Sequence, residues 1–247
     1  KGRVNGNVLM GRFFLALKEK AEFAIVEMAG GVKDNAIPKN AKASFLVNDV
    51  DTVKATVDAL NAKLKAEYGV ADPDAELILT MGEAKECVVL SECAKEKMLT
   101  TLNLMPNGVQ AMSQDLPGLV ETSLNMGIMT MDGESLKMSF AVRSSIESAK
   151  HYLTDRVILF VDMLGGNCEI KGDYPGWAYN PKSDLRETFI KVYREMYGKE
   201  PVVEAIHAGL ECGLFTKKID GLDSISIGPN MHNVHTSEET LEVGSVQ

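Results

Sequence analysis

Two histidines near the end of the chain, His232 and His235, have side chains that can bind a metal. They follow a predicted apolar strand at residues 224–227 and a Gly228-Pro229 turn. Because Pro229 indicates a loop, the two imidazoles are not expected to share a helical face. A histidine at the end of a buried strand suits a metal ligand, but one histidine cannot hold a catalytic metal. The spacing alone leaves His235 open between a metal ligand and a surface or packing histidine.

A second candidate region spans residues 204–213. A predicted strand ends there at a turn of small residues that contains His207 and Gly209, and a short helix follows. Open α/β sheets bind ligands at the carboxyl ends of their strands, and backbone N–H groups at a helix start can hold a carboxylate. The alternative is a core histidine beside a tight glycine turn.

Two polar residues earlier in the chain are candidate substrate ligands. Arg143 ends an otherwise apolar strand, and Asn35 lies in a glycine-rich loop at residues 30–38. Arginine can clamp a carboxylate through two parallel hydrogen bonds, and an asparagine amide can hydrogen-bond a ligand. The alternatives are an exposed strand-end charge for Arg143 and a turn cap for Asn35.

Composition narrows the classes of function. The 247 residues carry a net charge of −9, with a pI of about 5.1, which argues against a general nucleic-acid binder. No apolar run reaches the roughly 18 residues that span a bilayer. None of the four cysteines forms a Cys-x-x-Cys pair, so a zinc knuckle is not expected. A cytoplasmic location is the simplest expectation.

Apolar periodicity predicts the elements that must position these residues. Helices are predicted at residues 4–17, 48–69, 91–104 and 146–164. Strands are predicted at residues 22–28 and 41–47, and a hairpin joins residues 119–131 to 135–143. Further short strands are predicted at residues 76–81, 86–90 and 167–171.

The two halves of this region share one order: helix, hairpin, helix, strand. Ser44-Phe45-Leu46-Val47 and Ser139-Phe140-Ala141-Val142 align between them. We interpret this as an internal duplication that builds a continuous antiparallel sheet. Chance similarity between two amphipathic hairpins is the alternative.

Composition changes at the Pro/Gly/aromatic stretch of residues 172–177, which predicts a domain boundary. A helix at residues 185–196, a strand at 202–208, a short helix and a strand at 224–227 follow. Alternating helices and strands favour part of a three-layer α/β domain. Some 70 residues are too few for such a domain to stand alone.

Four segments, taken together and in this order, resemble the peptidase D family of aminoacyl-histidine or cytosol non-specific dipeptidases. These belong to the superfamily of aminoacylases, carnosinases and related zinc peptidases. The resemblance runs through essentially the whole chain. The segments are Lys33-Asp34-Asn35-Ala36-Ile37-Pro38, Ala141-Val142-Arg143-Ser144-Ser145, His207-Ala208-Gly209-Leu210-Glu211-Cys212-Gly213 and Ser226-Ile227-Gly228-Pro229-Asn230-Met231-His232-Asn233-Val234-His235-Thr236.

The resemblance implies a two-domain subunit. An α+β lid domain (residues 1–174) mediates dimerisation, and residues 175–247 form the C-terminal part of a catalytic α/β domain. Such enzymes activate a water molecule between two zinc ions to hydrolyse a dipeptide. His235 matches the last zinc ligand, and Asn35, Arg143 and Gly209 match substrate-binding positions.

The family's remaining zinc ligands and its general base have no counterpart in these 247 residues. We therefore expect a fragment of a cytoplasmic zinc dipeptidase that is inactive by itself. It contains no catalytic residue of its own, and its parent is expected to act on Xaa-His and other dipeptides. The alternative is a non-catalytic dimerisation or ligand-binding module built on the doubled α+β sandwich.

Overall fold

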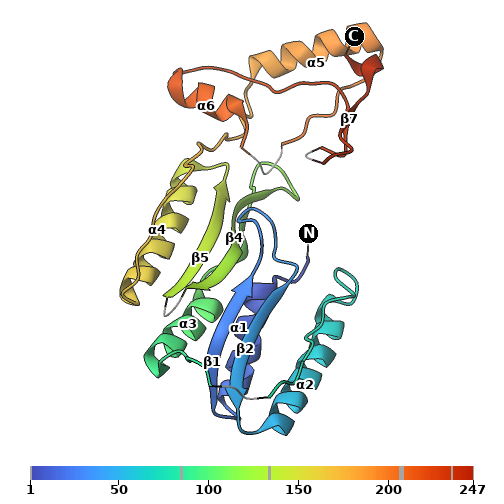
Figure 1. Cartoon of the computed structure of the whole chain (residues 1–247). Coiled ribbons are helices and arrows are strands. Elements are labelled where there is room, and N and C mark those ends of the chain that lie inside the picture. Colours follow the sequence, from blue (N-terminus) through green and yellow to red (C-terminus); the bar gives the residue numbers. More distant parts are fainter. Residues whose placement is uncertain (1, 84–85, 133–134, 206–208, 235, 247) are drawn as a thin grey trace. The chain divides into compact units, whose positions relative to one another are not determined.

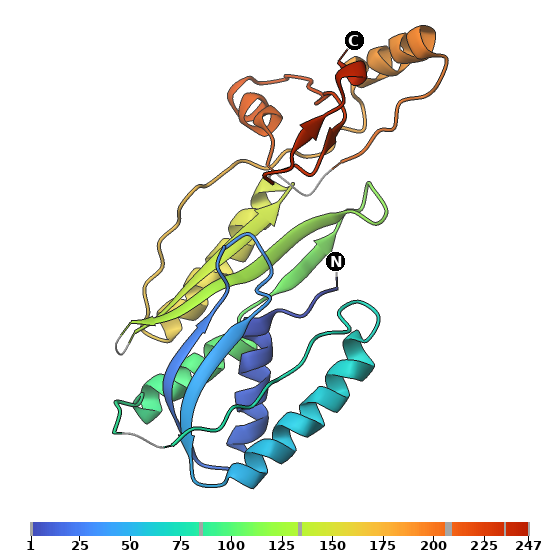
Figure 2. The same ribbon diagram turned by 45° about the vertical axis from the view of Figure 1, so that its right-hand side comes forward.

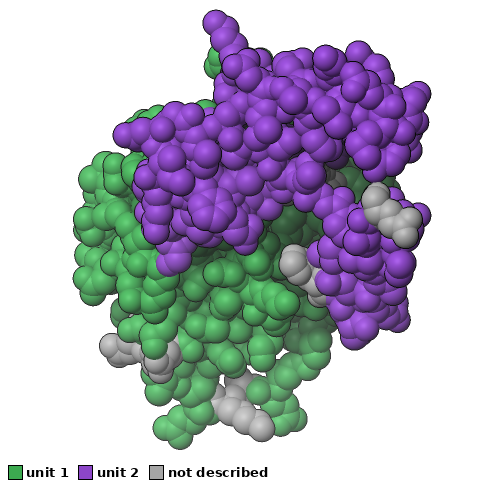
Figure 3. All heavy atoms as spheres, turned by 90° about the horizontal axis from the view of Figure 1, so that it is seen from above, with its two compact units in different colours: residues 1–171 green, residues 172–247 purple. Residues whose placement is uncertain are grey.

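The computed structural model of the chain describes residues 2–83, 86–132, 135–205, 209–234 and 236–246. The chain divides into two compact units, Lys1–Lys171 and Gly172–Gln247, which are coloured separately in Figure 3. The assignment of lid and catalytic domain to residues 1–174 and 175–247 stays a prediction.

In the first half of unit 1, one helix precedes a hairpin in the chain and a second helix follows it (Figure 1). Its elements are α1 (Gly6–Lys18), β1 (Phe23–Gly30), β2 (Ala41–Val47) and α2 (Val50–Tyr68). The Asn5 side chain caps α1 by accepting from two amides, and the Asp49 carboxylate caps α2. The Thr52 hydroxyl and amide donate to that carboxylate and lower the pKa of Asp49.

The second half of unit 1 repeats the helix, hairpin, helix order and adds a short strand. Its elements are α3 (Glu92–Leu104), β3 (Gly108–Met112), β4 (Val120–Asp132), β5 (Ser135–Ser144) and α4 (Glu147–Met163). The Ser91 hydroxyl caps α3. The predicted α+β class with an antiparallel sheet is confirmed, whereas internal duplication stays a prediction.

The sheet of unit 1 is antiparallel and centres on the long strand β4 (Figures 1 and 2). β5 pairs with one edge of β4 from Thr122 to Asp132. The other edge is shared, because β3 pairs with it up to Leu124 and β1 pairs with it only at Met129 and Thr130. Residues 125–128 of β4 therefore lie in a gap between two neighbouring strands.

Three asparagine side chains fill this gap. The Asn5 amide donates to the Met126 carbonyl oxygen over 3.0 Å, and the Met126 amide donates to Asn107 Oδ1 over 2.9 Å. The Asn7 amide lies 3.4 Å from the Met126 and Gly127 carbonyl oxygens. The pairing register with β5 shifts between Met126 and Ile128, so Gly127 is the extra residue of a β-bulge. The amides satisfy backbone groups that a strand neighbour would otherwise have paired.

Helices and the sheet of unit 1 enclose a continuous apolar core. The rings of Phe13, Phe14, Phe23 and Phe45 contact one another edge-on or stacked. Leu124, Met126 and Met129 of β4 are buried in the same cluster. Each fully buried side chain of this size stabilises the fold by roughly 1.5–3 kcal/mol.

Unit 2 has a different character. It contains α5 (Asp184–Tyr197), α6 (Glu211–Lys218), a two-stranded sheet of β6 (Met231–His232) and β7 (Thr240–Leu241), and a 3-10 turn at Val243–Ser245. Among its described residues, Pro175 is the one apolar side chain that is buried. Val192, Met196 and Tyr197 of α5 are exposed. Unit 2 therefore lacks an apolar interior of its own.

Several predicted short strands are wrong. Residues 76–81, 86–90, 167–171, 202–205 and 224–227 form no strand, and residues 206–208 lie outside the described part. An extended segment becomes a strand only where a neighbour completes a hydrogen-bond ladder. Leu90 donates one backbone hydrogen bond to Ile25 of β1, and the Asn61 side chain holds Leu77. These isolated bonds leave the chain extended without a ladder.

Candidate substrate-binding face

Arg143 lies on the exposed face of the sheet in unit 1. On β5, Lys137, Ser139 and Arg143 are exposed, whereas Met138 and Phe140 pack against the core. Arg143 pairs with Ser123 of β4, and directly opposite residues of an antiparallel pair project to the same face. Asn125, two residues further along β4, projects to that face too.

Asn35 lies in the connection between β1 and β2, which reaches alongside β4 (Figures 1 and 2). The Asn125 side-chain amide donates to the Asp34 carbonyl oxygen over 2.7 Å and to the Ala36 carbonyl oxygen over 2.9 Å. One amide thus holds the backbone on both sides of Asn35. The exposed Asn35 is thereby fixed to the strand that pairs with Arg143.

Two glycines let this connection approach β4 closely. A Cβ atom on Gly127 would lie 2.3 Å from the Asp34 carbonyl oxygen, and one on Gly31 would lie 1.8 Å from the Gly127 carbonyl oxygen. Gly31 also has a φ of +73°, which favours glycine. Any larger residue at either position would push the connection away from the sheet.

The structure brings Asn35 and Arg143 to one face of one unit. Asn125 and Arg143 are diagonal neighbours across β4 and β5, a relationship that separates Cα atoms by roughly 7–8 Å. Because the Asn125 amide holds the backbone on both sides of Asn35, the Arg143 guanidinium and the Asn35 amide suit a ligand with a carboxylate and a nearby polar group. Sequence reasoning missed Asn125 and Gly127, although a glycine inside a strand is a signal for a bulge or a close backbone approach.

Gly209 lies in unit 2, next to Leu210, the residue that precedes α6. A Cβ atom on Gly209 would lie 2.8 Å from Cδ1 of the Tyr174 ring. Desolvation, followed by the charge of the Glu211 carboxylate, raises the pKa of Tyr174. Among the described residues no side chain caps the start of α6 at Leu210, so its first amides have no side-chain acceptor there.

Of the three histidines in the predicted motifs, His207 and His235 lie outside the described residues. Their described neighbour His232 is exposed on β6, which pairs with β7 at Thr240 and Leu241. The connection between these strands turns at Asn233, whose φ is 51° and whose carbonyl oxygen accepts from the Thr236 hydroxyl over 2.7 Å.

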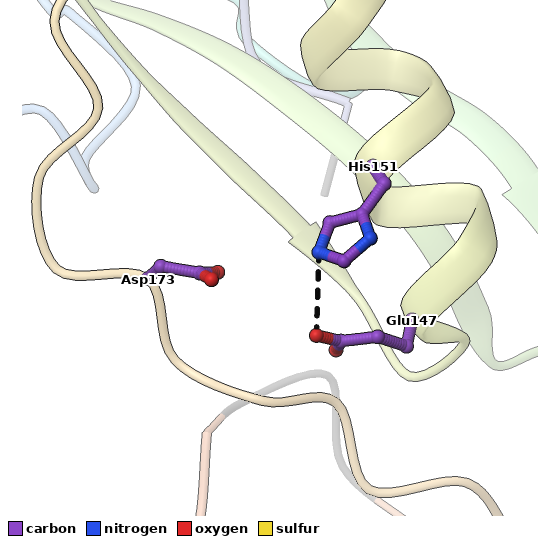
Figure 4. Close-up of side chains that lie close together, drawn as sticks. All are labelled: Glu147, His151 and Asp173. Carbon is purple, nitrogen blue, oxygen red and sulfur yellow. Dashed lines mark ion pairs between the residues drawn. The ribbon is translucent and has the colours of Figure 1, made fainter.

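Glu147 and His151 are candidate metal ligands on α4. Figure 4 shows them one helical turn apart, with Oε1 of Glu147 and Nε2 of His151 separated by 3.3 Å. The Glu147 carboxylate also lies 3.1 Å from Nζ of Lys150, which is buried. Asp173, drawn in the same view, belongs to unit 2. Within unit 1 this carboxylate already compensates a buried ammonium, so we assign no metal to the pair.

Comparison with known proteins supports the class of enzyme that the motifs predicted. No protein-family model matches the chain. The chain is nevertheless similar to peptide-hydrolysing enzymes over nearly all of its length, and in particular to peptidase D. It is 33% identical over 247 residues to the cytosol non-specific dipeptidase of Escherichia coli (strain K12). The aligned region covers 99% of this chain and 51% of that protein.

A solved structure gives the same result. The fold matches the crystal structure of aminoacylhistidine dipeptidase from Vibrio alginolyticus with a TM-score of 0.92 and 31% identity, over 100% of this chain and 51% of that one. The predicted resemblance to peptidase D is confirmed. The chain spans about half the length of each relative. No helix within the described part is long and apolar enough to cross a membrane.

Proposed function

We propose that this chain is part of a metal-dependent dipeptidase, in which unit 1 is the lid and unit 2 belongs to the catalytic domain. The observation that carries the proposal is the match of the entire chain to half of a dipeptidase, in sequence and in fold. The apolar side chains exposed on α5 support it, because a unit without an interior needs a further surface to cover it. The non-catalytic module is not favoured, since both relatives are enzymes.

In this proposal, unit 1 binds the substrate. The Arg143 guanidinium holds the C-terminal carboxylate of a dipeptide, and the Asn35 amide hydrogen-bonds the substrate nearby. Their position on one exposed face supports this assignment. In unit 2, Gly209 contributes substrate binding through its backbone, where the absence of a side chain permits close approach.

The proposed cofactor is zinc, two ions in the complete enzyme. When bound, such ions activate a water molecule for attack on a peptide carbonyl. The described residues do not offer the donor set for two ions: the described cluster of possible ligands in unit 1 is the Glu147–His151 pair. His235 is the proposed ligand in this chain, and this assignment rests on the sequence resemblance. We derive no reaction step through the metal.

We further propose a homodimer through unit 1 and, by analogy with the cytosol non-specific dipeptidase, a cytosolic location. Among the described strands, β5 pairs with β4 alone, so its outer edge is available to a second copy. Beside it, Tyr152, Leu159 and Met163 of α4 are 67%, 62% and 78% exposed. Sedimentation should give a dimer that Leu159→Glu dissociates. A monomer at high concentration would contradict this.

The function is tested with the complete protein that carries this chain. We expect hydrolysis of Xaa-His and other dipeptides, loss of activity with a chelator, and recovery with zinc. The 247-residue chain, assayed in parallel, should be inactive. Failure of the zinc-loaded complete protein to cleave any dipeptide would refute the proposal.

A further inference from the structure

The hydrogen bonds that the Asn125 side chain donates define its role. A side-chain amide has two N–H donors, and those of Asn125 go to the Asp34 and Ala36 carbonyl oxygens. Its orientation is fixed, because the opposite orientation would place the Asn125 carbonyl oxygen against two other carbonyl oxygens. With both donors engaged, Asn125 has no hydrogen to offer a substrate. These two N–H groups can therefore influence a bound ligand only through the backbone that they hold on both sides of Asn35.

The backbone next to Asn125 is itself fixed at the edge of β4, in the gap between β1 and β3. The next residue, Met126, accepts from the buried Asn5 amide and donates to Asn107. The bulge at Gly127 then brings the β4 backbone into contact with Asp34. The connection is therefore held at a rigid point of the sheet rather than at a mobile end.

We infer that Asn125 is a positioning residue that holds Asn35 beside Arg143 for substrate binding. The inference rests on the proposed role of Asn35 in binding the substrate. Arg143 belongs to a paired strand and needs no such support. Asn35 lies in a ten-residue connection between strands, so its place is set by the Asn125 anchor and the two close glycines.

A double-mutant cycle in the complete protein tests this inference. Asn35→Ala should raise KM about tenfold, the size of one lost hydrogen bond to a charged or polar substrate group. Asn125→Ala should raise KM severalfold with a smaller change in kcat. In the Asn35→Ala background, Asn125→Ala should change KM less than twofold, because the group that it positions is already gone.

Asn103→Ala is the matched control. The Asn103 amide also donates to two carbonyl oxygens, those of Gly11 and Leu99, but it joins α1 to α3. This change should lower stability and leave KM unchanged. Hydrogen exchange of the 247-residue chain gives a readout without activity: Asn125→Ala should speed exchange at residues 31–40, and Asn103→Ala should not.

The outcomes separate the two proposals. Unchanged exchange at residues 31–40, or KM effects of the two changes that simply multiply, would overturn the positioning role of Asn125. An unchanged KM in Asn35→Ala would overturn the substrate role of Asn35 and with it this inference. In that case faster exchange in Asn125→Ala would still identify Asn125 as the anchor of the connection.

Discussion

Asn5 and Met126 lie 121 positions apart in the chain, yet the Asn5 amide donates to the Met126 carbonyl oxygen over 3.0 Å. The same side chain caps α1 through its oxygen. A single buried residue thus joins the start of the first helix to the bulge in the central strand.

Asn5→Ala should destabilise unit 1 by about 2–3 kcal/mol. The change removes a helix cap, which is worth about 1 kcal/mol. It also removes the hydrogen bond that the buried Met126 carbonyl oxygen accepts from the Asn5 amide. Urea denaturation followed by far-UV circular dichroism measures the effect. Ser91→Ala, which removes the cap of α3 alone, should cost about 1 kcal/mol. Equal losses in the two variants would show that the link to Met126 contributes nothing.

Gly127→Ala should destabilise the chain by about 1–3 kcal/mol, because its Cβ would overlap the backbone of Asp34. It should also raise KM in the complete protein, since the connection that carries Asn35 must move. Gly82→Ala places its Cβ in open space and should change stability by less than about 0.5 kcal/mol. A neutral Gly127→Ala would argue against the close approach.

Arg143→Ala in the complete protein should raise KM about ten- to hundredfold, with kcat less affected. The expected size is that of a charge-assisted pair with a substrate carboxylate. Arg143→Lys should recover part of the loss, because lysine keeps the charge and loses the bidentate geometry. Arg156→Ala on α4 serves as the control. Unchanged steady-state kinetics in Arg143→Ala would remove this residue from the binding site.

His235→Ala in the complete protein should lower the zinc content from two ions per subunit toward one. Metal analysis after dialysis gives the count directly. The matched control is His232→Ala, three positions earlier and exposed on β6, which should keep both ions. Two zinc ions in the His235 variant would exclude this histidine as a ligand.

Asp223→Asn should destabilise unit 2 at neutral pH and lose this effect in acid. Hydrogen bonds from the Leu185 amide and the Ser183 hydroxyl lower the pKa of Asp223 in the folded state. A lowered pKa contributes stability above the unfolded value of about 3.9, and that contribution disappears as the pH falls through the folded value.

The single tryptophan, Trp177, lies in unit 2, so its fluorescence follows the unfolding of that unit. The difference in denaturation midpoint between Asp223→Asn and the parent should be clear at pH 7 and shrink as the pH falls below the unfolded value of about 3.9. The exposed Asp220→Asn should show no such difference at either pH. A pH-independent effect of Asp223→Asn would mean that its charge state does not matter.

The spacing of apolar residues predicted the helices and strands that turn one face toward the core. The spacing of Val53, Val57, Leu60 and Leu64 predicted α2, and all four side chains are buried. The strands that were predicted wrongly, such as residues 224–227, are short apolar runs. No local sequence pattern shows which segment would pair with such a run in a sheet. β3 was missed because its residues are mostly exposed and show no alternation.

The site was less predictable than the fold. Arg143 and Asn35 stood out as polar residues in an apolar strand and a glycine-rich loop. Asn5, Asn107 and Asn125 gave no comparable signal, because isolated asparagines are ordinary caps and turn residues. Their joint role depends on contacts between segments that are about a hundred residues apart. Such contacts arise only once the sheet is assembled.

The uneven distribution of buried apolar side chains between the two units also sets an order of folding. Unit 1 holds the whole described apolar core and can acquire its structure while the rest of the chain is still being synthesised. Unit 2 is synthesised after unit 1, and its described residues form no apolar interior to collapse around. Until another surface covers α5, Val192, Met196 and Tyr197 remain open to chaperones, proteases and self-association. The covering of unit 2 by another surface is therefore the step at which the assembly of this chain is most easily lost.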